Sequence, residues 1–196
     1  MFGDPVTNPM EWDNVALGNV VKVRSSKRVY QREQTTHGVP FLRVSDLVNR
    51  IANGLETNEL FMSDEQYEDF AASGLVPKSG DILVTSRGTL GLCYIVTDAD
   101  RFYFQDGMIS WLDRQESRIN SIYLAFLFQT DMIKQQLEAI STGSTVNYIS
   151  LGNLEGFNIL LPPLPFQNRF ADFVRAADKS KFVARKATQT LKALVL

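Results

Sequence analysis

The stretch "NILLPPLPFQNRF" (residues 158–170) changes from an apolar run to a proline-rich turn and then to a helical pattern. Proline cannot donate to a β-ladder and biases the residue before it away from helix, so Pro162 and Pro163 are expected to end a strand. Pro165 suits the first turn of a helix, where its missing N–H costs nothing. The sequence therefore predicts a stiff corner, from which a helix leaves the strand at a set angle.

A long helix is predicted from about Pro165 to residue 196. Its heptad a and d positions are apolar over more than three heptads, apart from Ser180, and this spacing is typical of a supercoiling helix. At 1.5 Å per residue the helix would reach roughly 45 Å, which is too long for a cap on a single domain. The predicted dimerisation face consists of Phe170, Phe173, Ala177, Ala184, Leu191 and Leu194.

The sequence before this helix mixes strand and helix signals. "DILVTSRGTLGLCYIV" (residues 81–96) predicts a β-hairpin, because Gly88 and Gly91 can take the positive φ of a tight connection. Other segments rich in β-branched and aromatic residues predict further strands. They are "NVVKVR" (19–24), "MISWL" (108–112) and "GFNILL" (156–161).

Two helices are predicted among these strands. "SDEQYEDFAASG" (residues 63–74) has the capping-box pair Ser63 and Gln66 and the stop signal Gly74. "NSIYLAFLFQTDMIKQQLEAI" (120–140) has helical apolar spacing, with Asn120 as its cap. The predicted fold class is α+β: a mixed α/β domain with β-hairpins over residues 1–163, followed by a long coiled-coil-forming helix over residues 164–196.

Composition describes a globular protein of 196 residues, 44% apolar and 21% charged. The longest apolar stretches fall short of the ~20 residues of a membrane helix, and the first residues carry no secretory signal. The single cysteine, Cys93, excludes an internal disulfide and lies in the apolar run "GLCYIV". We expect a buried strand thiol and a cytoplasmic location.

Charge is segregated along the chain although the net charge is only −2. Residues 22–32 carry five basic residues and no acid, residues 56–69 six acids and no base, and residues 169–192 seven basic residues against two acids. Such segregation can focus a positive field on one face. The alternative is a solvated surface with uneven charge.

Enzyme signatures are absent from the sequence. It has no nucleophile elbow, phosphate-binding loop or His/Cys cluster with metal spacing, and its only histidine, His37, lies in a polar loop. We therefore expect no catalysis, no cofactor and no metal, and a small-molecule enzyme is the least favoured class.

Four blocks, in this order, resemble the specificity subunits of type I restriction–modification systems, and the resemblance covers about residues 11–196. The blocks are "GVPFLRVSDL" (38–47), "SGDILVTSRGTLG" (79–91), "STGSTVNYISLGNL" (141–154) and "FNILLPPLPFQNRFADFVRAAD" (157–178). The resemblance implies two target-recognition domains per full subunit, each followed by a long helix, with the helices packed antiparallel as a spacer. This chain matches half of that plan, either as a separate half-subunit or as a piece of a two-domain subunit.

The resemblance implies a non-catalytic subunit that directs methyltransferase and restriction subunits to a bipartite site in double-stranded DNA. The apolar heptad stripe of the C-terminal helix, which is too large to leave in water, predicts in addition a homodimer through that helix. Arginine can pair bidentately with guanine and asparagine with adenine, so polar and basic residues on loops beside the blocks are candidates for DNA contact. The DNA-binding candidates are Arg43, Ser45, Arg87, Thr89, Ser144, Thr145 and Asn147, with Lys27 and Arg28 as phosphate contacts.

Two alternatives stay open at this point. For each candidate residue, ordinary surface exposure competes with DNA contact. For the whole chain, the runner-up is a protein–protein adaptor with a helical assembly module and a globular domain that binds a peptide or protein. Salt-dependent binding to a DNA duplex distinguishes the two functions.

Overall fold

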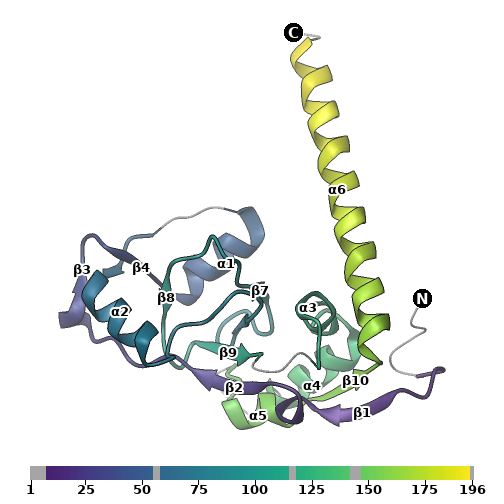
Figure 1. The fold of residues 1–196 in the computed structure, drawn as a ribbon, viewed down its shortest axis with the longest axis horizontal. Coiled ribbons are helices and arrows are strands. Elements are labelled where there is room, and N and C mark those ends of the chain that lie inside the picture. Colours follow the sequence, from purple (N-terminus) through teal and green to yellow (C-terminus); the bar gives the residue numbers. More distant parts are fainter. Residues whose placement is uncertain (1–7, 55–57, 115–117, 142–146, 195–196) are drawn as a thin grey trace.

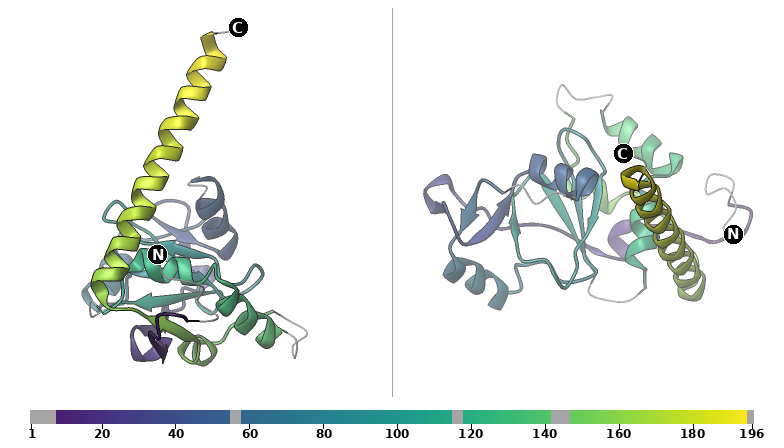
Figure 2. Two further views of the ribbon diagram at one scale, coloured as in Figure 1. Left: turned by 90° about the vertical axis from the view of Figure 1, so that its right-hand side faces the viewer. Right: turned by 90° about the horizontal axis from the view of Figure 1, so that it is seen from above.

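The computed structural model describes residues 8–54, 58–114, 118–141 and 147–194, with the side chains of the last helix described as far as Lys179. A mixed α/β body carries one long helix, α6 (Leu164–Leu194), which rises away from one end of the body (Figures 1 and 2). The mixed fold class is as predicted; supercoiling of α6 with a partner helix stays a prediction.

A four-stranded antiparallel sheet, in the order β2-β9-β6-β7, forms the centre of the body. Its strands are β2 (Lys22–Ser25), β9 (Ile109–Asp113), β6 (Ile82–Thr85) and β7 (Cys93–Ile95). β6 and β7 form the predicted hairpin, with Ile82 opposite Ile95 and Val84 opposite Cys93. Every residue of β6 and β9 is buried, because both faces of this sheet are covered.

A second sheet, in the order β3-β5-β4-β8, lies beside the central one. It consists of β3 (Gln34–Thr35), β5 (Phe61–Met62), β4 (Val39–Leu42) and β8 (Tyr103–Phe104). β4 and β8 are parallel, so their carboxyl ends meet at one edge. There the N–H of Gln105 donates to the carbonyl of Leu42 at 2.9 Å.

A third, two-stranded sheet pairs β1 (Asp13–Ala16) with β10 (Asn158–Leu161). β10 ends directly before Pro162, as predicted. Two short 3₁₀ helices lie in the N-terminal part of the chain, η1 (Leu17–Asn19) after β1 and η2 (Gln31–Glu33) before β3.

The helices before α6 are α1 (Val44–Asn53), α2 (Asp64–Ala72), α3 (Ser121–Leu127), α4 (Asp131–Ser141) and α5 (Leu151–Glu155). The predicted caps of α2 and α3 are confirmed. The Ser63 hydroxyl accepts from the N–H of Gln66 at 3.2 Å, and the Asn120 side chain accepts from the N–H of Ile122 at 2.9 Å. The sequence did not predict α1 and α5.

The single helix predicted over residues 120–140 was wrong, because α3 and α4 are separate. The break lies at Thr130, whose hydroxyl and N–H both donate to the carbonyl of Leu127, at 2.6 and 3.0 Å. The carbonyl of Thr130 then accepts from the N–H of Lys134. Thr130 thus closes one helix and opens the next, a use of a local side-chain hydrogen bond that apolar spacing does not reveal.

Three buried clusters form the core. The largest lies between the central sheet and α3, α4 and α5, and includes Ile82, Leu124 and Ile133. The second covers the other face of that sheet, where Leu47 of α1 packs with Trp111. The third packs α2 on the second sheet.

The proline corner holds α6 against the body. Gln167, fully buried in the first turn of α6, donates to the carbonyls of Pro162 at 2.7 Å and Arg118 at 3.2 Å. Phe170 packs edge-on against the rings of Tyr123 and Phe126 of α3. The angle at which α6 leaves the body is therefore set by the contacts that Gln167 and Phe170, just after the prolines, make with the body.

The predicted dimerisation face divides at the base of α6. Phe170 is partly buried within its own chain, whereas Phe173 is 62% exposed. Ala177 is partly buried, and the side chains of Ala184, Leu191 and Leu194 lie outside the described residues.

In the part of the chain that the structure describes, no helix combines the length and the apolar character needed to cross a membrane.

Candidate nucleic-acid interface

Several loops of the body end at one edge of the central sheet. The ends of β2 and β6 lie beside the start of β9, because Ser25 is opposite Ser110 and Thr85 is opposite Ile109. The turn between β8 and β9 then connects this edge to the carboxyl ends of β4 and β8 in the second sheet. We call the whole region the loop edge; it consists of residues 25–28, 43–45, 86–91, 105–108 and 147–148.

The turn between β8 and β9 ties the ends of β2 and β4 together. The N–H of Gly107 donates to the Ser25 hydroxyl at 3.2 Å, and Arg28 pairs with Asp106 at 2.8 Å. At the end of β4, the Leu42 carbonyl accepts from Gln105. The segments that carry Lys27, Arg28 and Arg43 are therefore fixed relative to one another.

The residues that follow β6 are hydrogen-bonded on both sides. The N–H of Ser86 donates to the carbonyl of Met108, and the N–H of Ile149 donates to the carbonyl of Ser86, both at 2.9 Å. The hydroxyls of Ser86 and Ser110 share a buried hydrogen bond of 2.6 Å. Arg87 thus leaves a well-anchored backbone.

The turn between β6 and β7 is built on Thr85, which is fully buried. Its hydroxyl donates to the carbonyl of Thr89 and accepts from the N–H of Leu92 at 3.0 Å. Gly88 and Gly91 take φ values of 76° and 78°, as the hairpin prediction required. Thr89 and Arg87 are exposed on a turn with a defined shape.

The structure places most of the predicted DNA-binding residues at the loop edge. All but Arg43 of those it describes are exposed there, namely Lys27, Arg28, Ser45, Arg87, Thr89 and Asn147. Ser45 lies on α1, in its first turn. Ser144 and Thr145 lie outside the described residues.

These residues differ in how fully their charges are already paired. Arg43 binds Asp46 at 3.1 Å and Glu59 at 2.8 Å, and these hydrogen bonds raise the pKa of its guanidinium further. The Lys27 amine lies over the Phe70 ring, 4.9 Å from the centroid.

Arg87 is paired differently. Among the described residues no carboxylate lies within ion-pair distance of it, and its Nη1 contacts the Met108 sulfur at 3.9 Å. Arg87 is therefore the guanidinium of the loop edge that is most available to a ligand.

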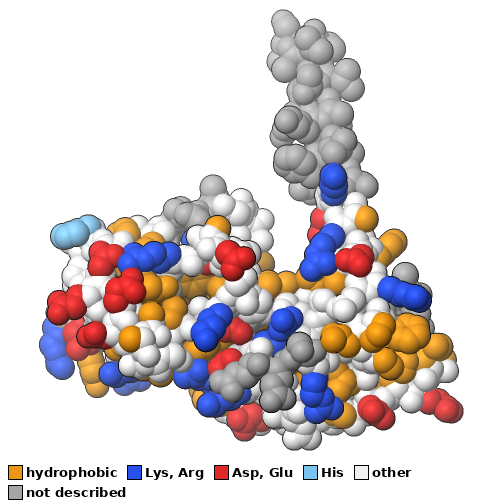
Figure 3. All heavy atoms as spheres, in the orientation of Figure 1, with side chains coloured by type: hydrophobic (Ala, Val, Ile, Leu, Met, Phe, Trp, Pro, Cys, Tyr) orange, Lys and Arg blue, Asp and Glu red, His pale blue; other side chains and the backbone are white. Residues whose placement is uncertain are grey.

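On the face seen in Figure 3, the expected segregation of charge does not produce a uniform positive patch over the described residues. Arg24 lies over the Trp111 ring, 4.1 Å from the centroid, and pairs with Asp113 at 2.8 Å. On the face seen in Figure 3, basic and acidic side chains lie interspersed over the body. The basic segment 22–32 thus contributes to internal ion pairs as well as to the surface.

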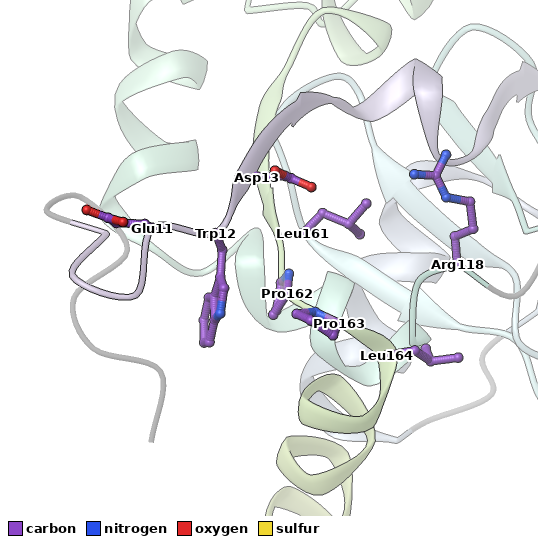
Figure 4. Close-up of a pocket in the computed structure, with 8 residues that line it drawn as sticks. All are labelled: Glu11, Trp12, Asp13, Arg118, Leu161, Pro162, Pro163 and Leu164. Atoms are coloured by element: carbon purple, nitrogen blue, oxygen red, sulfur yellow. The ribbon is translucent and has the colours of Figure 1, made fainter.

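A pocket of about 520 Å³ lies at the corner between β1, β10 and α6. Trp12 and Arg118 stand on opposite sides of the Pro162–Pro163 turn (Figure 4). The pocket contains none of the predicted DNA-binding residues.

Among the described residues no cluster of His, Cys, Asp and Glu side chains could hold a metal ion.

Cys93 belongs to β7 and packs at the border of the largest core cluster. Burial raises the pKa of its thiol. Cys93 is therefore a strand thiol, as the apolar flanks predicted, although the residue is only partly buried. It is not an activated nucleophile.

Sequence reasoning missed two residues of the loop edge, Tyr148 and Met108. Tyr148 is 41% exposed and forms an isolated antiparallel bridge with Arg87. The alternation of exposed Tyr148 with fully buried Ile149 is a short strand signal. That signal is visible in "VNYIS", but its pairing with Arg87 is not.

The model of the type I restriction modification DNA specificity domain matches residues 9–192 of the chain. A Haemophilus influenzae protein provisionally named as a type I restriction enzyme specificity subunit is 27% identical over 178 residues. That match covers 90% of this chain and 42% of the relative. The MjaIX specificity subunit of Methanocaldococcus jannaschii is 24% identical, with 85% and 38% covered.

Solved structures show the same fold. A chain of a type I restriction–modification system matches with a TM-score of 0.63 and 19% identity, over 94% of this chain and 43% of that one. The HsdS subunit from Thermoanaerobacter tengcongensis matches with a TM-score of 0.60 and 18% identity, over 91% and 40%. The chain thus spans less than half the length of these relatives. Because the family model covers nearly all of its residues, the chain belongs to the family of type I restriction–modification DNA specificity domains.

Proposed function

We propose that the chain reads one half of a split site in double-stranded DNA for a type I restriction–modification complex, in the cytoplasm, through its loop edge. The family is one of recognition domains, and catalysis belongs to other subunits. The observation that carries the proposal is the position of Arg87: exposed, without a carboxylate partner among the described residues, and anchored on both sides.

The loop edge offers the two kinds of contact that sequence-specific binding needs. Lys27 and Arg28 can hold phosphates, which positions the protein but carries no sequence information. Arg87, Thr89 and Asn147 lie on loops and can reach base edges, where arginine reads guanine O6 and N7 and asparagine reads adenine. Arg43 contributes to DNA contact only if DNA replaces Glu59 as its partner.

The two parts of the chain have different roles in this proposal. Residues 1–163 form the target-recognition domain, and residues 164–196 form the spacer and dimerisation helix. Two copies joined through α6 place two readers in opposite orientations, as the two-fold axis of a homodimer requires. The assembly then directs methyltransferase and restriction subunits, its proposed partners, to an interrupted palindrome.

Co-expression with a cognate methyltransferase subunit, followed by mapping of the methylated sites, tests this function. The wild-type chain should yield one bipartite motif. Arg87→Ala should weaken binding to that motif by about 1–3 kcal/mol without changing the affinity for random duplex. Arg87→Lys keeps the charge but lacks the bidentate fork, so it should lose nearly as much.

Lys78→Ala is the matched control, because Lys78 is exposed but lies before β6, at the opposite end of that strand from Arg87. It should leave the motif unchanged. Equal losses on target and random DNA would assign Arg87 to the phosphate backbone. A wild-type chain that binds no duplex in a salt-dependent manner would favour the adaptor function instead.

A further inference from the structure

Arg87 and Tyr148 form a close cross-strand pair at the loop edge. Their bridge is antiparallel, and the hydrogen bond from Ile149 N–H to Ser86 carbonyl, 2.9 Å long, flanks it. This pattern puts the two residues in a non-hydrogen-bonded position, where side chains point to the same face and Cα atoms lie ~4.5 Å apart. The side chains of Tyr148 and Arg87 therefore leave the backbone on the same face, and both are exposed.

Met108 flanks Arg87 as well. Its sulfur lies 3.9 Å from Nη1 of Arg87, and its backbone carbonyl accepts from Ser86. The Met108 side chain is partly exposed. Arg87, the one guanidinium of this edge without a carboxylate partner among the described residues, thus has apolar or aromatic neighbours. An arginine that binds phosphate would gain nothing from such neighbours.

An arginine among apolar side chains suits the edge of bases rather than the backbone. In the major groove guanine presents two acceptors, whereas thymine presents a C5-methyl group that binds apolar side chains. Neighbouring side chains about 5 Å apart match one to two base steps, which rise ~3.4 Å each. Cytosine lacks the methyl, so such a pair of contacts distinguishes a thymine from a cytosine near the guanine.

Resting on the proposed function, we infer that Tyr148, with Met108, is a specificity-determining residue. It contacts the C5-methyl group of a thymine one or two base pairs from the guanine that Arg87 reads. The half-site of this chain therefore contains a guanine and a thymine at that separation. The apolar surface reads the methyl, and the anchored backbone on both sides of Ser86 keeps the two contacts in register.

The test uses the assembled methyltransferase complex and duplexes that carry the mapped motif. Each thymine of the half-site is replaced in turn by uracil, which removes only the C5-methyl group. One replacement should weaken wild-type binding about fourfold, the loss expected for one buried methyl group at ~0.8 kcal/mol. Tyr148→Ala should bind the thymine and uracil duplexes equally, and Tyr148→Phe, which keeps the ring, should restore the preference.

Tyr30→Ala is the matched control, since Tyr30 is a similarly exposed tyrosine, at 49%, outside the loop edge. It should keep the wild-type preference for thymine. The inference is overturned by a half-site without thymine, by a wild-type complex indifferent to every uracil, or by a Tyr148→Ala complex that still prefers thymine. In those cases specific binding survives and the proposed function stands. A complex that does not distinguish its motif from a scrambled duplex overturns both.

Discussion

The side-chain oxygen of Gln167 accepts a hydrogen bond of 2.8 Å from the backbone N–H of Asn120, 47 residues earlier in the chain. Asn120 is also the N-cap of α3. The amide nitrogen of Gln167 donates to two further backbone carbonyls. One buried side chain therefore joins the first turn of α6 to the start of α3 and to the end of β10.

Replacing Gln167 should destabilise the body more than replacing its exposed neighbour Asn168. Gln167→Leu leaves the N–H of Asn120 without its partner, and each buried unpaired group costs about 1–3 kcal/mol. We expect a loss of roughly 2–4 kcal/mol in urea unfolding, with an unchanged m-value. Asn168→Ala removes only an exposed hydrogen bond to Asn120 and should cost less than about 1 kcal/mol. Equal losses for both variants would deny Gln167 this role.

The corner itself could be predicted, but its internal bonding could not. Pro162 and Pro163 restrict the backbone of the residues next to them, so their effect can be predicted from the local sequence. The partners of Gln167 lie in segments far along the chain, and local patterns do not report such pairings. Thr130 is a different case: its hydroxyl bonds the carbonyl of Leu127, which is close in sequence, but apolar spacing does not report a side-chain hydrogen bond, so one continuous helix was predicted there.

The loop edge shows the same division. Arg87 and Thr89 were found because glycine turns and hairpin spacing are local signals. α1 was missed because its N-cap, Arg43, is not among the favoured capping residues; the box is completed by Asp46. Tyr148 was missed because only the long-range bridge brings it beside Arg87.

Two glycines of the β6–β7 turn should differ in their tolerance of alanine. Both have positive φ, so either substitution should cost roughly 1–2 kcal/mol of backbone strain. A Cβ on Gly88 meets nothing, whereas a Cβ on Gly91 lies 2.8 Å from Cδ1 of Leu137. Gly91→Ala should therefore cost about 1 kcal/mol more than Gly88→Ala in thermal unfolding. In a Leu137→Ala background that difference should disappear, and a persistent difference would exclude the clash as its cause.

The stability of the body should depend on pH in the alkaline range through Tyr103. Burial raises the pKa of this phenol to about 12, from an ordinary value of about 10. The fold favours the protonated form, so this contribution is complete below about pH 10 and is lost as the pH rises through about 12. Tyr103→Phe should lose less unfolding free energy than the wild type between these two pH values. Equal pH slopes for the two proteins would mean that Tyr103 does not titrate in the folded state.

Self-association should depend on the exposed face of α6. Phe173 is 62% exposed, and burial of one such side chain contributes about 1.5–3 kcal/mol. Phe173→Glu should therefore weaken a dimer at least tenfold in sedimentation experiments, with little change in the stability of the body. Lys179→Glu, on the same helix and exposed, changes the charge by two units where Phe173→Glu changes it by one, so it is a strict control for added negative charge. An intact chain that is monomeric at tens of micromolar without other subunits would remove the homodimer from the proposal.

The length of α6 should set the gap in the DNA motif. Deleting residues 178–184 removes one heptad, so the a and d positions on either side stay in register. Each helix becomes about 10 Å shorter, which corresponds to roughly three base pairs at ~3.4 Å per step. Methylome sequencing of cells that carry each version should then show the same two half-sites with a gap shortened by a few base pairs. A gap of unchanged length would mean that other subunits, not the helix, hold the two readers apart. An asymmetric motif with two different halves would instead mean that this chain works beside a different recognition domain.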